Sequence, residues 1–201
     1  MKAHSYLALG DSYTIGEQVN LAKSFPYQTV RLLRIAGQSF YAPEIVATTG
    51  WTTDELKHAI DERQLLPSYD FISLLIGVNN QYRGRSVDEF RVHFRSLVEW
   101  ALTHVNGEAG RLVVLSIPDW GVTPFADGRD RQVIQDEIDM YNFICQAEAE
   151  HFHAGFLDIT TAQRRDGANA AFLSEDKLHP SALEYAKWAT QLCNKIISIL
   201  Q

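Results

Sequence analysis

Phe71-Ile72-Ser73-Leu74-Leu75-Ile76 is an almost unbroken apolar run, and Leu112-Val113-Val114-Leu115 repeats the pattern farther along the chain. A strand with one face in water alternates apolar and polar residues, whereas a parallel strand covered on both faces reads as a continuous run. Both segments are therefore assigned to the interior of a parallel sheet. With three further apolar runs, the predicted strands are Tyr6–Leu9, Glu44–Thr48, Phe71–Gly77, Arg111–Ile117 and Phe156–Ile159.

Helical segments separate these strands, and several of them open with a start signal. A Ser or Thr followed three residues later by Glu forms a capping box, which satisfies free N–H groups in the first helical turn. The pattern occurs at Thr52–Glu55, Ser86–Glu89 and Ser181–Glu184, and Ser24 followed by Pro26 is a further expected start. The strand–helix alternation predicts a single α/β domain over residues 1–201. It is expected to be a three-layer α/β/α sandwich with a five-stranded parallel sheet and right-handed crossovers.

The charge of the chain narrows its range of partners. The 201 residues carry a formal net charge of −7, and Lys and Arg are scattered, so neither nucleic acid nor an anionic membrane is an expected partner.

No apolar run approaches the roughly 18 residues that span a bilayer. The first residues lead into a strand without an apolar segment that ends in small residues. We therefore expect no secretory signal and a cytoplasmic protein, in which Cys145 and Cys193 are reduced core thiols.

Chemistry-bearing residues follow the predicted strands. Ligands of open α/β sheets bind outside the carboxyl ends of the strands, so the segments found there are candidates for a site. A Ser near one end of the chain, with an Asp and a His near the other, supplies the three members of a nucleophile–base–orienter triad. In strand order, the segments are Gly10-Asp11-Ser12, Thr49-Gly50-Trp51, Gly77-Val78-Asn79-Asn80, Pro118-Asp119-Trp120 and Asp176-Lys177-Leu178-His179.

These segments resemble the sequence blocks of the SGNH (GDSL-type) hydrolases. Gly10–Gly16 resembles the first block, Gly50 the glycine of the second, Gly77-Val78-Asn79 the third, and Asp176–His179 the last, with an Asp three residues before the His. The blocks occur in family order over most of the chain. The resemblance implies the flavodoxin-like, SGNH type of α/β/α fold and an ester hydrolase that needs no metal or cofactor.

The resemblance also implies a role for each residue. Ser12 would be the nucleophile, His179 the general base and Asp176 the residue that orients the imidazole. The oxyanion hole would consist of the backbone N–H groups of Ser12 and Gly50 and the side-chain amide of Asn79. The chemistry suits these roles, because glycine lets an N–H group approach the substrate closely and an amide donates without adding charge.

One position departs from the family pattern. The third block usually reads Gly-x-Asn-Asp, and here Asn80 occupies the last position. The family Asp is neither nucleophile, base nor oxyanion donor, so we expect activity to survive. A neutral Asn cannot supply the charge-assisted bonds of a carboxylate, so the local support of this loop is expected to differ.

Other polar residues have weaker claims to a catalytic role. Asp158 is a rival for the acid of the triad, although a structural role in the last strand is favoured. His151 and His153 lie two residues apart near a helix end and do not share a face, which argues against a metal site. No P-loop, Gly-x-Gly-x-x-Gly or Gly-x-Ser-x-Gly motif occurs, so no nucleotide cofactor is expected.

Four aromatic residues beside the motifs are candidates for walls of a substrate pocket, with the pinning of loops to the core as the alternative. They are Trp51, Tyr82, Trp120 and Phe125. Aromatic walls suit both sugars and acyl chains, so the substrate stays open.

The leading hypothesis is a serine esterase that acts on a small-molecule ester through an acyl-enzyme on Ser12. The alternatives are a thioesterase, an acyltransferase or a peptidase that uses the same site. A non-catalytic module that holds a glycan or lipid in its cleft is the alternative from another class.

Overall fold

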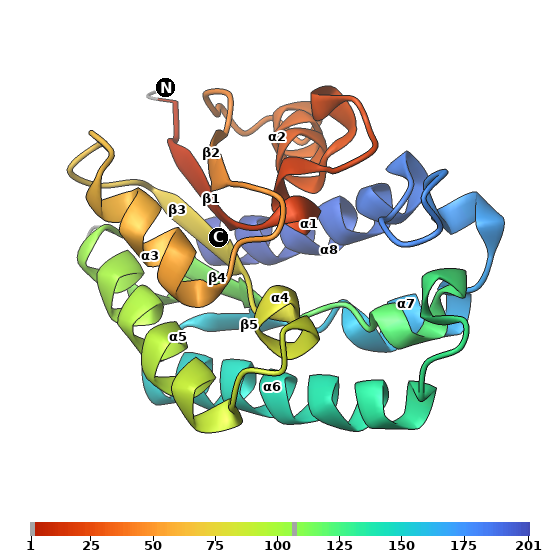
Figure 1. The fold of residues 1–201 in the computed structure, drawn as a ribbon. Coiled ribbons are helices and arrows are strands. Elements are labelled where there is room, and N and C mark those ends of the chain that lie inside the picture. Colours follow the sequence, from red (N-terminus) through yellow and green to blue (C-terminus); the bar gives the residue numbers. More distant parts are fainter. Residues whose placement is uncertain (1–2, 106–107) are drawn as a thin grey trace.

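The predicted apolar runs pair into one parallel sheet in the computed structural model, which describes residues 3–105 and 108–201 (Figure 1). All five predicted strands are confirmed, with ends that differ by one or two residues. β3 and β4 stop two residues before the predicted ends, because the chain leaves the sheet there toward the loops of the candidate site. The strands are β1 (Tyr6–Gly10), β2 (Glu44–Ala47), β3 (Phe71–Leu75), β4 (Leu112–Leu115) and β5 (Gly155–Leu157).

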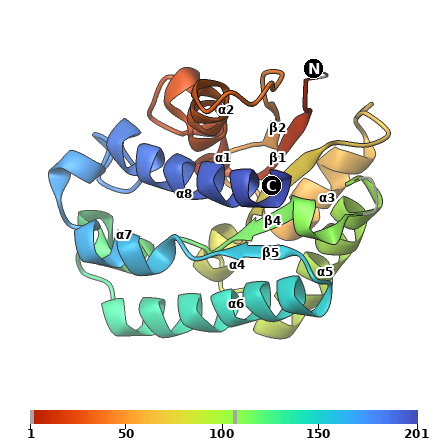
Figure 2. The same ribbon diagram turned by 180° about the vertical axis from the view of Figure 1, so that it is seen from behind.

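Helices cover both faces of the sheet, as the three-layer prediction requires. Figures 1 and 2 show α2 and α8 side by side on one face, and α3, α5 and α6 along the other. The α helices are α1 (Ser12–Ile15), α2 (Phe25–Ile35), α3 (Thr53–Asp61), α4 (Val78–Tyr82), α5 (Val87–Thr103), α6 (Arg131–His151), α7 (Thr160–Asp166) and α8 (Ala182–Leu200). Short 3₁₀ turns are Leu21–Lys23, Ala109–Arg111, Trp120–Val122, Pro124–Ala126 and Ala170–Phe172.

The order of the strands explains where a site can form. The sheet runs β2-β1-β3-β4-β5, the flavodoxin-like order, so the chain goes from β1 outward to β2 and then returns to β3 on the other side. The segments that follow β1 and β3 therefore diverge, and a crevice opens between them at the carboxyl edge. β1 and β3 are in register from Tyr6↔Phe71 to Gly10↔Leu75, so Ser12 and Asn79 both emerge at this edge.

The predicted helix starts are confirmed, but the return bond of the capping box forms only at α3. Glu55 Oε2 accepts the backbone N–H of Thr52 at 2.8 Å. Ser86 and Ser181 cap their helices through their hydroxyl groups. The Glu residues of those two boxes bind other partners, Arg85 for Glu89 and the Trp188 indole for Glu184.

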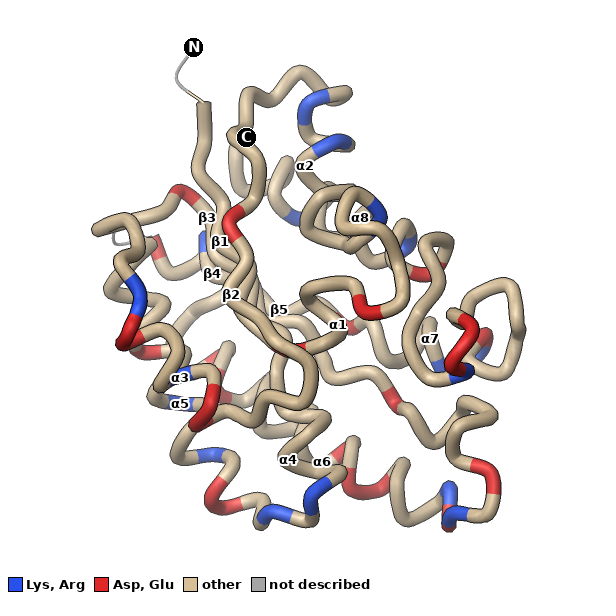
Figure 3. The backbone as a smooth tube through the Cα atoms, turned by 45° about the horizontal axis from the view of Figure 1, so that its top comes forward, with Lys and Arg blue, Asp and Glu red and all other residues tan. Residues whose placement is uncertain are grey.

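Most charged residues lie on the helices and loops, where positive and negative residues are intermixed (Figure 3). The central strands β1, β3 and β4 contain no charged residue and are buried along their whole length, as parallel strands covered on both faces should be. Cys145 and Cys193 are free thiols and are buried. Among the described residues, no helix combines the length and apolarity needed to cross a membrane.

Candidate active site

Ser12 lies at the tight junction between β1 and α1. Asp11 caps α1, and its Oδ1 accepts the backbone N–H of Tyr13 at 3.0 Å. A Cβ atom on Gly10 would collide with Thr14 and with the backbone carbonyl of Leu75, so only glycine fits at the end of this strand. The junction leaves the Ser12 hydroxyl at the carboxyl edge of the sheet with a side chain that is largely buried.

His179 contacts Ser12 although the two residues lie at opposite ends of the chain. His179 Nε2 lies 3.0 Å from Ser12 Oγ, which is within hydrogen-bond distance. The imidazole is largely buried and packs against the Tyr13 ring, with centroids 5.5 Å apart. A serine hydroxyl and an imidazole nitrogen at this distance can exchange a proton.

Asp176 holds the other side of the imidazole. Its Oδ2 lies 2.5 Å from His179 Nδ1, and its Oδ1 accepts the backbone N–H groups of Leu178 and His179, both at 3.0 Å. Partial burial opposes ionisation of Asp176, but these hydrogen bonds outweigh it and hold the pKa of the carboxyl below its ordinary value. The group that faces the imidazole is therefore a carboxylate, which fixes the proton of a neutral ring on Nδ1 and leaves Nε2 to accept.

The predicted oxyanion donors lie on three neighbouring segments. Asn79 Nδ2 donates to the Trp51 carbonyl at 3.0 Å, which orients the amide and leaves its second N–H free to point elsewhere. Within residues 3–105 and 108–201, the backbone N–H groups of Ser12 and Gly50 have no acceptor. Three donors at one sheet edge are what a developing oxyanion requires.

One cleft unites these groups. It has a volume of about 190 Å³ and is lined by Ser12, Tyr13, Thr49, Gly50, Val78, Asn79, Tyr82, Trp120, Phe125, Leu178 and His179. None of these described lining residues is Asp, Glu, Lys or Arg. Tyr13, Thr49, Val78 and Leu178 were not singled out from the sequence, although each is the immediate neighbour of a motif residue.

Three of the four predicted aromatic residues form one wall of the cleft. The Tyr82 ring lies edge-on to Trp120, with centroids 5.3 Å apart, and Phe125 lies 6.0 Å from Trp120. Trp51 does not line the cleft; its carbonyl binds Asn79 and its ring packs against the core, so the expectation of a pocket wall is not met there. Adjacency to Gly50 does not fix which way the Trp51 side chain points, and here the partly buried ring packs against the core.

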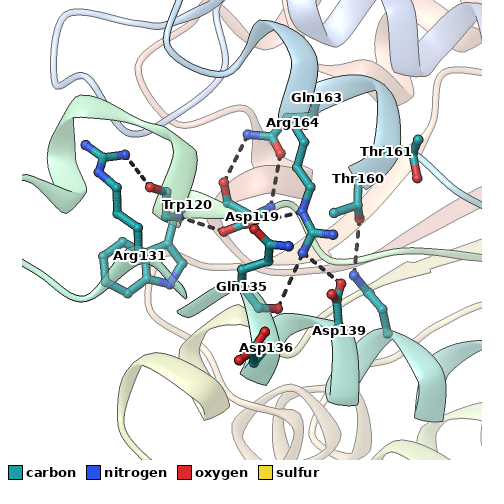
Figure 4. Close-up of polar contacts among 12 residues, drawn as sticks. Asp119, Trp120, Arg131, Gln135, Asp136, Asp139, Thr160, Thr161, Gln163 and Arg164 are labelled. Atoms are coloured by element: carbon teal, nitrogen blue, oxygen red, sulfur yellow. Dashed lines mark hydrogen bonds and ion pairs between the residues drawn. The ribbon is translucent and has the colours of Figure 1, made fainter. Parts of the chain in front are cut away.

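A polar network behind the cleft anchors the loop that carries Trp120, and Figure 4 shows Arg164 between Asp119 and Asp139. Arg164 Nε donates to the buried Asp119 Oδ2 at 2.9 Å, and Nη2 pairs with Asp139 at 2.7 Å. Asp119 Oδ1 also accepts the N–H of Gly121 at 2.8 Å. The Trp120 indole donates to Gln81 at 2.7 Å, so this wall is fixed from two sides.

Asn80, the departure from the family pattern, is fully buried beneath the same edge. Its Oδ1 accepts the backbone N–H of Thr53 at 3.1 Å, and its Nδ2 donates to Thr53 Oγ1 at 2.9 Å. The neutral amide satisfies both groups, so it ties α4 to the start of α3 without a charge.

The polar residues that the sequence analysis placed outside the catalytic site make contacts elsewhere in the fold. Asp158 lies after β5 and binds Thr161 and Ser116, so it supports the start of α7. The ring of His151, at the end of α6, packs edge-on against Phe152. Within the described residues, no cluster of three or more His, Cys, Asp or Glu side chains could hold a metal ion.

Comparisons with known proteins agree with this fold. The profile of the GDSL-like Lipase/Acylhydrolase family matches residues 8–187. The fold is similar to that of a lipase/acylhydrolase from Enterococcus faecalis, with a TM-score of 0.77 and 18% identity over 96% of this chain and 95% of that one. No curated protein sequence matches the chain.

Two esterases share the fold as well. An acetylxylan esterase from Geobacillus stearothermophilus gives a TM-score of 0.74 with 21% identity over 96% of this chain and 94% of that one. A psychrotrophic esterase from a Pseudoalteromonas species, in a structure inhibited by monoethylphosphonate, gives 0.71 with 13% identity over 98% of both chains.

Proposed function

The chain belongs to the GDSL-like lipase/acylhydrolase family, and from that premise we propose that it is a serine esterase that forms an acyl-enzyme on Ser12. The observation that carries the proposal is the continuous chain of contacts from Ser12 Oγ through His179 to Asp176, with distances of 3.0 and 2.5 Å. A nucleophile in contact with a base, and a base held by a carboxylate, form the arrangement that activates a weak serine nucleophile.

In the first half-reaction, His179 Nε2 takes the proton of Ser12 as Oγ attacks the ester carbonyl carbon. The tetrahedral intermediate collapses with cleavage of the carbon–oxygen bond to the alcohol, which leaves with the proton held on His179. In the second half-reaction, His179 deprotonates a water molecule that attacks the acyl-enzyme. The carboxylic acid is released and the Ser12 hydroxyl is restored.

The negative charge of each intermediate falls on the former carbonyl oxygen. The N–H groups of Ser12 and Gly50, which have no acceptor among the described residues, and the second N–H of Asn79 are the donors that we assign to it. Loss of one such donor typically costs about 3–4 kcal/mol of transition-state stabilisation.

The cleft supports a small neutral substrate. Its volume of about 190 Å³ lies below the roughly 300–1,000 Å³ of typical drug-sized pockets, and no charged carboxylate, ammonium or guanidinium group lines it within the described chain. A short acyl group meets both limits, whereas the phosphates of an acyl-CoA find no cation in the cleft. Similarity to an acetylxylan esterase also supports an acetyl or other short-chain ester.

Two measurements test the proposal. Treatment with p-nitrophenyl ethylphosphonate should add one ethylphosphonyl group to the peptide that contains Ser12, read by intact mass and peptide mapping, and Ser12→Ala should acquire none. An adduct that persists in Ser12→Ala would exclude Ser12 as the nucleophile. A panel of p-nitrophenyl esters and acyl-CoAs should show the highest kcat/KM for the shortest acyl esters, and a long-chain optimum would contradict the proposed substrate class.

A further inference from the structure

Gly50 occupies the third position of a tight turn that follows β2. The N–H of Trp51 donates to the carbonyl of Thr48 at 3.3 Å, which closes the turn over four residues. Gly50 has a φ of +86°, and Thr49 is not among the residues with positive φ. A positive φ at the third position alone identifies a type II turn.

The type of this turn decides where the N–H of Gly50 points. Types I and II differ by a rotation of the central peptide, which here joins Thr49 to Gly50, so the change from one to the other reverses the direction of that N–H. Glycine populates positive and negative φ about equally, so the residue itself does not hold the type II state. The Gly50 N–H can therefore keep its place at the cleft only if the turn as a whole is held against the neighbouring segments.

Arg83 contacts the turn from the neighbouring segment. Its Nη2 donates to the carbonyl of Gly50 at 2.6 Å, and its Nη1 lies 3.3 Å from both carboxylate oxygens of Glu55. Arg83 is the C-cap residue directly after α4, the short helix that carries Asn79. One guanidinium thus joins the segment of one proposed oxyanion donor to the segment of another.

We propose that Arg83 is a positioning residue of the oxyanion hole, because it binds the Gly50 carbonyl and holds the turn that carries the Gly50 N–H in place against the segment that carries Asn79. Arg83 does not line the cleft itself, so it acts through the turn and not on substrate. The inference rests on the proposed esterase function. The alternative is that Arg83 only forms an ion pair with Glu55, and because that pair is exposed its loss should change stability little and kinetics not at all.

Arg83→Met and Arg83→Lys test the inference, with Arg85→Met as the matched control. Met keeps most of the apolar stem and removes the donors, whereas Lys keeps one flexible donor. Arg85 forms a comparable ion pair with Asp54 on α3 but does not contact the turn. The readouts are kcat and KM for p-nitrophenyl acetate, the rate of phosphonylation at Ser12, and the melting temperature.

We expect Arg83→Met to lower kcat and the phosphonylation rate about tenfold, a fraction of the loss caused by deleting a whole oxyanion donor, with KM within about twofold of wild type. Arg83→Lys should recover part of that loss, and Arg85→Met should keep wild-type kinetics. An Arg83→Met enzyme with the kinetics of Arg85→Met, or one that changes only in KM or melting temperature, would overturn the role. Failure of the wild type to label at Ser12 would instead overturn the proposed function.

Discussion

The Nδ1 atom of His179 lies 2.5 Å from Oδ2 of Asp176, and only two residues separate these partners in the sequence. The contact is local because Lys177 adopts a left-handed conformation with a φ of +60°, which turns the chain back on itself. The same turn lets Oδ1 of Asp176 cap the N–H groups of Leu178 and His179. The predicted orienter and base therefore form one preassembled unit, and folding has only to bring Ser12 to it.

Asp176→Asn should lower kcat by about 10³–10⁴ with little change in the fold. An amide at this position can donate to Nδ1, which would place the ring proton on Nε2 and leave no acceptor for the Ser12 hydroxyl. Asp158→Asn is the control, because Asp158 binds Ser116 and Thr161 instead. Steady-state kinetics on p-nitrophenyl acetate separate the two, and a comparable loss in Asp158→Asn would mean that the acid of the triad is wrongly assigned.

Gly50→Ala should abolish most activity while costing little more stability than the same change at Gly37. Both glycines have positive φ, +86° and +83°, so Ala at either position is expected to cost about 1–2 kcal/mol. A Cβ on Gly50 has room, with its nearest neighbour, Arg83 Nη2, at 3.6 Å, and Gly37 has open space. Only Gly50→Ala should reduce kcat, by about 10²–10³, as the turn rotates its N–H away from the cleft. Urea unfolding together with kinetics checks both statements, and equal kinetics in the two variants would remove Gly50 from the oxyanion hole.

Phe125→Ala should shift the preference of the enzyme toward longer acyl chains. Phe125 is half-exposed at the edge of the aromatic wall, so its removal enlarges the cleft without emptying the core. Each extra methylene that finds an apolar surface is worth about 0.8 kcal/mol, so the ratio of kcat/KM for hexanoate over acetate should rise about tenfold or more. Phe143→Ala, at an exposed position on α6 that does not line the cleft, should leave the ratio unchanged. An unchanged ratio in Phe125→Ala would place the acyl group elsewhere.

The strands could be predicted from the sequence because burial on both faces leaves a continuous apolar run, but their ends could not. β3 stops at Leu75 because the chain bends away at Gly77, whose φ is +133°. β5 starts at Gly155, which carries no side chain to signal a strand. A Cβ there would lie 3.2 Å from the Lys195 side chain, a tight contact that only the packed structure reveals.

The residues of the candidate site also form two groups: some are indicated by sequence motifs, and others are linked to the cleft only by tertiary contacts. Ser12, Asn79 and His179 could be proposed from the sequence because each lies in a short motif at the end of a strand or before a helix. Trp51 was misplaced because adjacency to Gly50 says nothing about which way a turn directs the next side chain. Arg83 and Arg164 lie outside every motif, and their partners lie far away in sequence, so only tertiary structure links them to the cleft.

Asp11→Asn should stabilise the protein more at alkaline pH than at acidic pH. Burial raises the pKa of Asp11 from its ordinary value of 3.8 to about 7 in the folded state, so between those values the folded protein retains a proton that the unfolded chain has lost. Stability from this group is therefore fully present below about pH 4, falls as the pH rises toward 7 and is constant above it. Asn keeps the cap on Tyr13 without titrating. The difference in free energy of unfolding between variant and wild type should grow with pH to a value on the order of 4 kcal/mol. Urea unfolding across that range measures it, and parallel pH profiles for the two proteins would show that Asp11 does not titrate with folding.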